Sequence, residues 1–148
     1  MTGTIALSGA RPAAIRLLVG TPYAIVTDPA TADDGKVLVV HLTTGVVTSF
    51  YVSPDRSGGT GDVVIVGSTA YIANQAGGSI FILPLSISGT IVTGVATALK
   101  VGLGARALAV DTRDNLLLVL VQGKGEIVLV SLIRTSCWKS LRRQHERR

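Results

Sequence analysis

"YIANQAGGSIFILPLS", residues 71–86, decides the fold, because it places two apolar runs on either side of a glycine-rich turn. Short runs of branched and aromatic residues separated by Gly, Asn and Ser predict two β-strands joined as a hairpin. Three related stretches contain such a hairpin, and they begin at Gly9, Thr60 and Gly104. A spacing of roughly 45 residues between similar units indicates a repeat architecture.

Each repeat contains short apolar strands separated by turns that are rich in Gly, Asp or Asn. The first two repeats have four predicted strands, and the third has three with no visible fourth. The predicted strands cover residues 13–18, 23–27, 37–42 and 46–52, then 63–66, 70–74, 80–85 and 90–96, and finally 107–110, 116–121 and 127–132.

Continuous apolar runs at this spacing predict strands that are covered on both faces, as in four-stranded sheets stacked radially around an axis. The predicted fold class is therefore all-β, with three four-stranded antiparallel β-propeller-type blades. The last blade is incomplete, and the ring is not closed within one chain. The predicted blades cover about residues 9–52, 60–98 and 104–132.

These blades form a partial β-propeller over residues 1–133, and residues 134–148 are a basic C-terminal tail. Within "TGTIALSGAR" at the start of the chain, residues 3–7 are similar to part of "SGTIVTGVA", residues 88–96. Because residues 90–96 are the predicted last strand of the second blade, we expect residues 3–7 to be the last strand of a preceding blade.

Two units carry a resemblance to a known family: "TAYIANQAGGSIFILPLSISGTIVTGV" from Thr69 and "GARALAVDTRDNLLLVLVQGKGEIVLVSL" from Gly104. They resemble the repeats of bacterial YVTN and NHL-type β-propellers, in which a "YVAN-x-GS-x-S-V-x-V-I-D" style hairpin precedes a "G-x-x-P-x-G-V-A-V-D" strand. The resemblance runs from Gly3 to Leu132. The middle repeat departs from it by opening with "TGDVVIVG", and the third by ending with "VLVSL". It implies a propeller fold within a superfamily of lactonase-like enzymes, cell-surface proteins and scaffolds.

The sequence does not decide how the ring is closed, because propellers close with about four to eight blades and the chain supplies about three. One possibility is that the chain is a fragment of a longer propeller, which the abrupt change of composition in "IRTSCWKSLRRQHERR" favours. A second is a homodimer with two-fold symmetry, in which residues 3–7 of each subunit complete the third blade of the other and close a six-bladed ring. The third is an open stack.

The basic charge of the chain lies in its tail. The formal net charge is +5, and residues 134–148 hold six basic side chains and one acidic one, which leaves the repeats neutral. Nucleic acid or an anionic membrane is therefore expected as a partner only through the tail. The chain start lacks the pattern of a secretory signal, and the longest apolar run, residues 116–121, is too short to span a bilayer. The single Cys137 forms no intramolecular disulfide, and the compartment stays open.

A candidate ligand site lies at one end of the predicted blades. There the first strand of each blade starts, its second strand ends, and a turn joins its second and third strands. Antiparallel order places all three features at one end of the sheets, which we call the loop face. Arg11, Asp62 and Arg106 occupy equivalent strand starts there, and Asn74 ends a second strand. Two arginines beside an aspartate fit a carboxylate or phosphate ligand. The alternative is that the arginines pair with Asp62 or nearby carbonyls and only link adjacent blades.

No catalytic residue, metal site or cofactor is predicted. The chain has no G-x-S-x-G motif, and most of its Asp residues stand in turns, where they form local backbone hydrogen bonds. The predicted function is a non-catalytic, propeller-derived binding or scaffold module and a fragment of a longer propeller, with a protein or small-ligand partner on the loop face. The alternative is a fragment of a lactonase-like propeller hydrolase.

Overall fold

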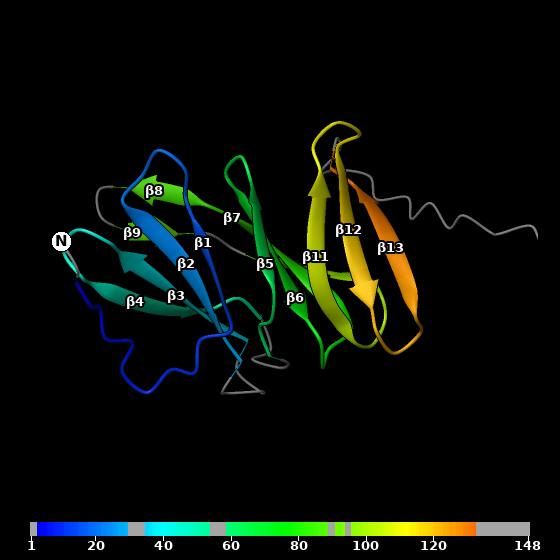
Figure 1. Ribbon diagram of the computed structural model, residues 1–148, viewed down its shortest axis with the longest axis horizontal. Helices are drawn as coiled ribbons and strands as arrows, with labels where there is room; N and C mark the ends of the chain where they lie inside the picture. The colour runs from blue at the N-terminus through cyan, green and yellow to red at the C-terminus, as the bar shows by residue number, and fades with distance from the viewer. Residues whose placement is uncertain (1–2, 30–34, 54–58, 89–90, 94–95, 133–148) are drawn as a thin grey trace, which may run out of the picture.

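The computed structural model describes residues 3–29, 35–53, 59–88, 91–93 and 96–132 (Figure 1). In these ranges the chain is all-β, with three antiparallel sheets and one separate two-stranded hairpin. No helix that is long and apolar enough to cross a membrane occurs among these residues. The basic tail with Cys137 lies outside the described residues, so its predicted partners stay predictions.

The first sheet has the strand order β1-β2-β3-β4. Its members are β1 (Ala14–Leu17), β2 (Tyr23–Asp28), β3 (Lys36–His41) and β4 (Val47–Tyr51). Every neighbouring pair is antiparallel, and β2 and β3 pair in register from Tyr23↔His41 to Asp28↔Lys36. Because side chains alternate between the two faces of a strand, the continuous apolar runs of β2 and β3 make both faces of the sheet apolar.

The second sheet has the order β10-β7-β6-β5. Its members are β5 (Val63–Val66), β6 (Thr69–Asn74), β7 (Ser79–Pro84) and β10 (Thr97–Lys100). The prediction of the fourth strand over residues 90–96 is wrong, because β9 (Ile91–Thr93) pairs instead with β8 (Ser86–Ser88) in the separate hairpin. β10 takes the place beside β7, where its Leu99 packs against the core between the second and third sheets.

The third sheet has three strands in the order β11-β12-β13, and within the described residues it has no fourth, as the sequence predicted. Its members are β11 (Ala105–Asp111), β12 (Leu116–Val121) and β13 (Glu126–Ser131). A register shift between Ala105 and Ala107 indicates a β-bulge in β11. β13 is therefore the strand at which a further strand would continue this sheet.

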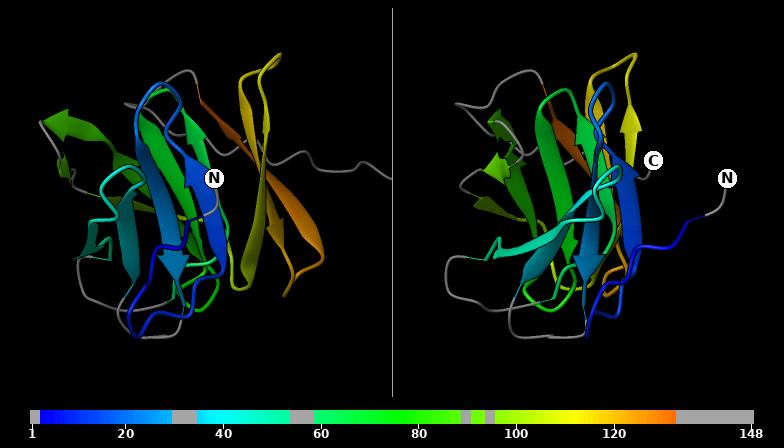
Figure 2. Two further views of the ribbon diagram at one scale, coloured as in Figure 1. Left: turned by 60° about the vertical axis from the view of Figure 1, so that its left-hand side comes forward. Right: turned by 90° about the vertical axis from the view of Figure 1, so that its left-hand side faces the viewer.

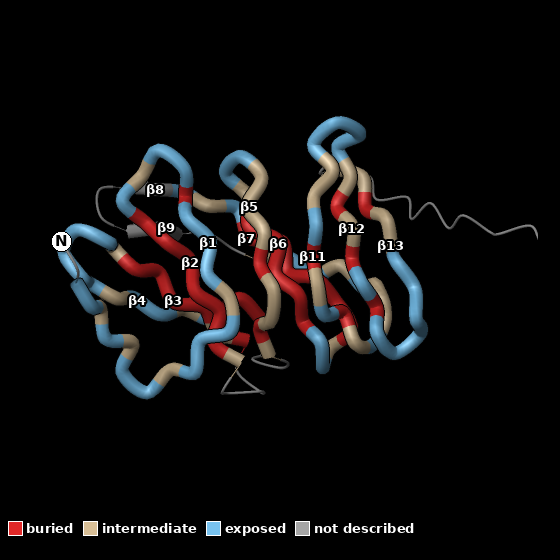
Figure 3. Tube along the Cα trace, viewed as in Figure 1, coloured by how far each residue is buried: buried red, intermediate tan, exposed pale blue. Residues whose placement is uncertain are grey.

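The three sheets stand side by side in chain order, with the second between the other two (Figures 1 and 2). An apolar core that includes Ile25, Val37 and Phe81 fills the space between the first and second sheets. A second core that includes Tyr71, Leu117 and Val119 fills the space between the second and third. The most continuously buried segments are accordingly in β2, β3, β6 and β7 (Figure 3).

Residues 3–7 do not form the predicted strand in this single chain. Ile5 and Leu7 instead pack on a cluster that includes Leu38 and Val40, on the face of the first sheet that points away from the second. The physical reason is that this apolar sheet face needs a cover, and the preceding segment of the chain is close enough to provide it.

The architecture is that of β-propeller blades. The first strands β1, β5 and β11 lie next to one another, and the sheets pack face to face behind them (Figure 1). The three blades do not close a ring within the described chain, in agreement with the fold class that the sequence predicts.

Candidate functional site

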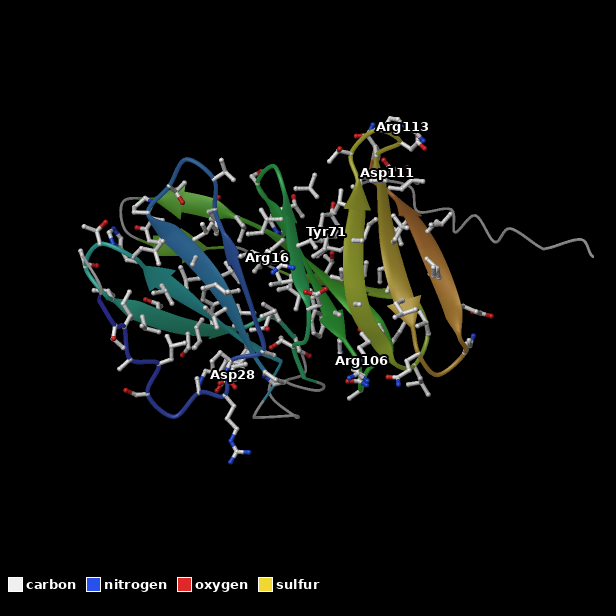
Figure 4. The ribbon with its side chains drawn as sticks, viewed as in Figure 1. Arg16, Asp28, Tyr71, Arg106, Asp111 and Arg113 are labelled. Atoms are coloured by element: carbon white, nitrogen blue, oxygen red, sulfur yellow. The ribbon has the colours of Figure 1, made fainter. Side chains whose placement is uncertain are left out.

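The loop face is formed by the starts of β1, β5 and β11 and the ends of β2, β6 and β12. Asp28 at the end of β2 and Arg106 in β11 lie toward this end of the molecule, whereas Asp111 and Arg113 lie at the opposite end (Figure 4). The antiparallel order predicted from the sequence therefore places the candidate residues at one end of the sheets.

Asp62 links all three blades. It stands just before β5, and its Oδ2 atom accepts a hydrogen bond of 2.9 Å from the backbone N–H of Leu108 in the third sheet. Its Oδ1 atom accepts the N–H of Val63 at 2.9 Å and lies 3.5 Å from a guanidinium nitrogen of Arg16 in the first sheet. A short acidic side chain at this position therefore joins the second sheet to both of its neighbours.

The arginine that pairs with Asp62 is Arg16, and neither Arg11 nor Arg106 takes that place. Arg106 donates a hydrogen bond of 2.7 Å to Oε1 of Gln122 within the third sheet. Arg11 uses its backbone N–H, which donates to Oδ1 of Asp28 at 3.2 Å. The predicted group of two arginines around Asp62 is therefore not formed, because Arg16 on the inner strand β1 is closer to that carboxylate.

A second link joins the first and second sheets through Thr60. The backbone N–H of Asp28 donates to Oγ1 of Thr60 at 3.0 Å, and this hydroxyl donates to the carbonyl oxygen of Lys36 at 2.6 Å. Thr60 is fully buried and Asp28 is 3% exposed. Both polar groups are thus removed from water with hydrogen-bond partners, which is the condition for a buried polar contact to stabilise a fold.

Asn74, the fourth predicted ligand residue, stabilises the turn between β6 and β7. Its Oδ1 atom accepts the backbone N–H of Gly77 at 2.9 Å, and its Nδ2 atom donates to Oγ of Ser79 at 3.3 Å. This is the local side-chain to backbone hydrogen bond for which Asn is favoured in turns. Asn74 is 3% exposed and has a structural role in this turn, and its role toward a ligand stays a prediction.

Arg16 is the functional candidate that the sequence reasoning missed. Its side chain is 47% exposed beside Asp62, and one guanidinium nitrogen, Nη1, donates to the carbonyl oxygen of Ile15 at 2.8 Å. A single cation within the apolar strand "AIRL" is the signal that could have identified it. An arginine with a fixed guanidinium and an open side is suited to bind a carboxylate or phosphate in bidentate fashion.

The fold clearly changes the pKa of the Tyr71 side chain. Burial raises the pKa of its phenol above the ordinary value of 10.0, because the charged form would lose its hydration between the second and third sheets. Tyr71 therefore stays neutral at physiological pH and acts as a core residue. Among the residues that the structure describes, no group of three or more His, Cys, Asp or Glu side chains gathers to hold a metal ion.

A cleft of about 410 Å³ opens between the first and second sheets at the end opposite the loop face. It lies between the β1–β2 turn and the β5–β6 turn, and aliphatic side chains provide most of its walls. Its lining residues are Leu17, Leu18, Val19, Thr21, Ile65, Gly67, Ser68 and Leu85. None of the predicted ligand residues contributes to it.

Comparison with solved structures supports the propeller architecture. The chain superposes on a candidate 6-phosphogluconolactonase from Bacteroides fragilis NCTC 9343 with a TM-score of 0.72 and 16% sequence identity, over 90% of this chain and 38% of that one. A candidate 6-phosphogluconolactonase from Bacteroides uniformis ATCC 8492 gives a TM-score of 0.70 and 14% identity, over 90% of this chain and 40% of that one. The chain thus spans about two fifths of the length of these neighbours.

At these identities the likeness establishes the fold and leaves the activity open. No protein-family model matches the sequence, and a search of curated proteins found no match. The chain is therefore a set of β-propeller-type blades whose function has to be argued from its own residues.

Proposed function

We propose that the chain is part of a lactonase-like β-propeller and that the side formed by its first strands, where Arg16 lies beside Asp62, binds the anionic group of a phosphorylated sugar lactone or of the corresponding acid. The fold likeness to two candidate 6-phosphogluconolactonases supports this proposal. The resemblance of the repeats to YVTN and NHL units supports it as well, because that superfamily includes lactonase-like enzymes. The alternative function considered from the sequence thus becomes the leading one.

The observation that carries the proposal is the pair formed by Arg16 and Asp62. Arg16 stands on an inner strand, its side chain is half exposed, and Asp62 holds one side of its guanidinium at 3.5 Å. The remaining donors of the guanidinium are available to a phosphate or carboxylate that enters from solvent. Asp62 accepts two backbone N–H bonds in addition, so its role is to position Arg16.

The chemistry of the proposed reaction is the hydrolysis of a cyclic ester. Water adds to the carbonyl carbon, the ring C–O bond breaks, the ring oxygen leaves as a hydroxyl group, and the carbonyl carbon becomes that of a carboxylate with release of a proton. Binding of the distant phosphate can orient the ester toward the reacting groups. The contribution that we assign to this chain is that binding step, since the chain spans about two fifths of the neighbours.

Binding of 6-phosphogluconate to the full chain, followed by calorimetry, tests the proposal. We expect Arg16→Gln to weaken binding about tenfold or more, because a hydrogen bond to a charged group contributes about 1.5–3 kcal/mol. Arg113→Gln is the matched control, since Arg113 is an exposed arginine at the tip of the third sheet, away from β1. Equal binding by both variants, or no binding by the unaltered chain, would refute the proposal.

The non-catalytic binding or scaffold module, which is the other function considered from the sequence, gives a different result. Such a module binds a protein or glycan through the loop face and neither binds the sugar phosphate nor hydrolyses a lactone. Arg11 and Arg106 stay candidates for that contact, because both are exposed on the loop face. Parallel assays of lactone hydrolysis and of sugar-phosphate binding separate the two functions.

A further inference from the structure

Three connections meet at the loop face where the second and third blades adjoin, and we call them the glycine junction. They are the β6–β7 turn at residues 75–78, the β10–β11 link at residues 101–104 and the β12–β13 turn at residues 122–125. The carbonyl oxygen of Gly78 accepts the N–H of Gly102 at 3.0 Å, and the carbonyl oxygen of Gly104 accepts the N–H of Gln122 at 2.9 Å. Backbone hydrogen bonds therefore join all three connections.

The glycine junction is packed backbone against backbone, because its glycines carry no side chain. A Cβ on Gly78 would lie 2.9 Å from the backbone nitrogen of Leu103, and a Cβ on Gly123 would lie 2.8 Å from the carbonyl oxygen of Leu103. Any other residue at position 78 or 123 would push these connections apart, since Cβ atoms do not come so close to backbone atoms. The close packing thus holds the backbone groups of two blades in a defined arrangement.

Two backbone N–H groups of the glycine junction are left to bind a ligand. Among the described residues, the N–H groups of Leu103 and Gly123 have no hydrogen-bond partner. Both residues are exposed, and Leu103 is 68% exposed. Backbone N–H groups gathered in turns form binding sites for anions, as in many phosphate sites.

Two lysines from different blades extend over the glycine junction. Lys100, at the end of β10, donates from Nζ to the carbonyl oxygen of Gly77 at 2.9 Å, which holds its ammonium group beside the β6–β7 turn. The stem of Lys124 lies over the β10–β11 link, since its Cδ and Cε atoms are 3.9 Å from the place of a Cβ on Gly102. Within the described part of the chain, the ammonium group of Lys124 has no ion pair or hydrogen bond.

Arg106 adds a third cation at the loop-face end of β11 (Figure 4). One of its guanidinium nitrogens donates to Oε1 of Gln122 in the glycine junction at 2.7 Å, and its other donors stay available. Glu126 is the acidic residue of this part of the chain, residues 74–79, 100–106 and 121–126. Three basic residues and one acidic residue give these segments a net charge of +2.

We propose that the glycine junction is a binding site for a phosphate group. A phosphate group carries nearly two negative charges and presents three strong acceptor oxygens. Lysine binds phosphate as a point charge, and backbone N–H groups provide the directed hydrogen bonds. A carboxylate has two oxygens and one charge, so it would leave part of this donor set unused. Because Lys100 and Lys124 belong to different blades, the bound phosphate would also link the second blade to the third.

This site is separate from the one proposed around Arg16, which lies on β1 in the first sheet. Its three connections join strands of the second and third sheets, all of which the structure describes. The phosphate site therefore does not depend on further blades, and it is independent of the proposed function.

Titration of the isotope-labelled full chain with inorganic phosphate at constant ionic strength, followed by two-dimensional NMR, tests the proposal. The amide resonances of Leu103 and Gly123 are expected to move and to saturate. Lys124→Met removes the charge and keeps an unbranched stem over Gly102, so it should weaken phosphate binding about fivefold or more, while the rest of the amide spectrum shows that the fold is kept. Arg113→Gln and Arg16→Gln are the controls and should leave the affinity unchanged.

Other anions and vesicles define what carries the phosphate. Chloride should leave both resonances in place, and acetate should bind more weakly than phosphate. A response of the same resonances to vesicles that contain phosphatidic acid would assign the site to a lipid headgroup, and a response to inorganic phosphate without a response to these vesicles would assign it to a small phosphorylated molecule. The proposal is wrong if phosphate moves neither resonance, if acetate or chloride acts equally, or if Lys124→Met binds phosphate as well as the parent.

Discussion

Replacement of Asp62 by Ala is expected to loosen the joint between the second and third blades. The change removes the acceptor of the 2.9 Å hydrogen bond from the N–H of Leu108 and the partner of Arg16. It also removes the local bond to the N–H of Val63, which helps to hold the carboxylate in place. The inner strands β5 and β11 would then be held together by packing alone at this point.

The expected cost follows from the three contacts. A hydrogen bond to a charged group contributes about 1.5–3 kcal/mol, and the half-buried N–H of Leu108 loses that partner. The ion pair with Arg16 contributes less than about 1 kcal/mol, because solvent screens an arginine side chain that is 47% exposed. We therefore expect Asp62→Ala to lower the free energy of unfolding by about 2–4 kcal/mol and Arg16→Gln by less than about 1 kcal/mol.

Urea unfolding followed by circular dichroism measures these differences as shifts of the midpoint. Asp62→Asn should fall between the other two variants, because the amide keeps one carbonyl acceptor and loses the charge. Arg113→Gln removes an exposed ion pair with Asp114 and should leave the midpoint unchanged. If Arg16→Gln proves as destabilising as Asp62→Ala, the ion pair is the main contact of Asp62, and the assignment of that role to the Leu108 hydrogen bond is wrong.

Two further predictions concern the backbone and the core. Gly78 has a φ of +63°, and a Cβ there would lie 2.9 Å from the backbone nitrogen of Leu103. Gly45 has a φ of +73° with free space around it, so Gly78→Ala should lower the free energy of unfolding clearly more than Gly45→Ala. Equal urea midpoints for the two variants would contradict this. The raised pKa of Tyr71 means that the unfolded chain ionises first, so the stability contribution is complete below about pH 10 and is lost as pH rises further. Tyr71→Phe should therefore lose less stability than the parent between about pH 8 and pH 10.5 in thermal melts, and identical losses would argue against a buried phenol.

Much of the fold could be predicted from the sequence, because the strands are apolar runs bounded by turn residues. β5 and β12 match their predicted ranges, since sharp turns define both ends of each run. The last strand of the second sheet could not be found in this way. Residues 90–96 and Thr97–Lys100 are both suited to β-structure, and only the packing of Leu99 against the core selects the second.

The prediction for the chain start shares the same ambiguity. Residues 3–7 were expected to form an outer strand because they are similar to part of residues 88–96, yet β9 in that stretch pairs outside the blade. The similarity between the two segments therefore does not decide whether residues 3–7 form a strand of a blade. The apolar character of Ile5 and Leu7 was a correct sign of burial, and the sheet face that they cover depends on the assembled fold.

The candidate site was predictable in part for a related reason. Asp62 was identified from its place at a strand start, and it does link the blades. Its partner could not be named, because Arg11 and Arg16 are both near in sequence and the choice depends on which side chain of β1 points toward β5. The buried link through Thr60 also joins residues that are distant along the chain, and periodicity does not reveal such contacts.

The links and the cleft lead us to expect that the first two sheets are joined more stiffly at the loop face than at the other end. Thr60 and Asp62 fasten neighbouring sheets at the loop face, while the cleft of about 410 Å³ separates the first two sheets at the other. A change in the angle between these sheets should therefore widen or narrow the cleft while the hydrogen bonds at the loop face stay in place. In a propeller, the angle between adjacent blades sets the number of blades that complete the ring. Substitutions of cleft residues such as Ile65 and Leu85 are therefore expected to change that number while the links through Thr60 and Asp62 stay in place.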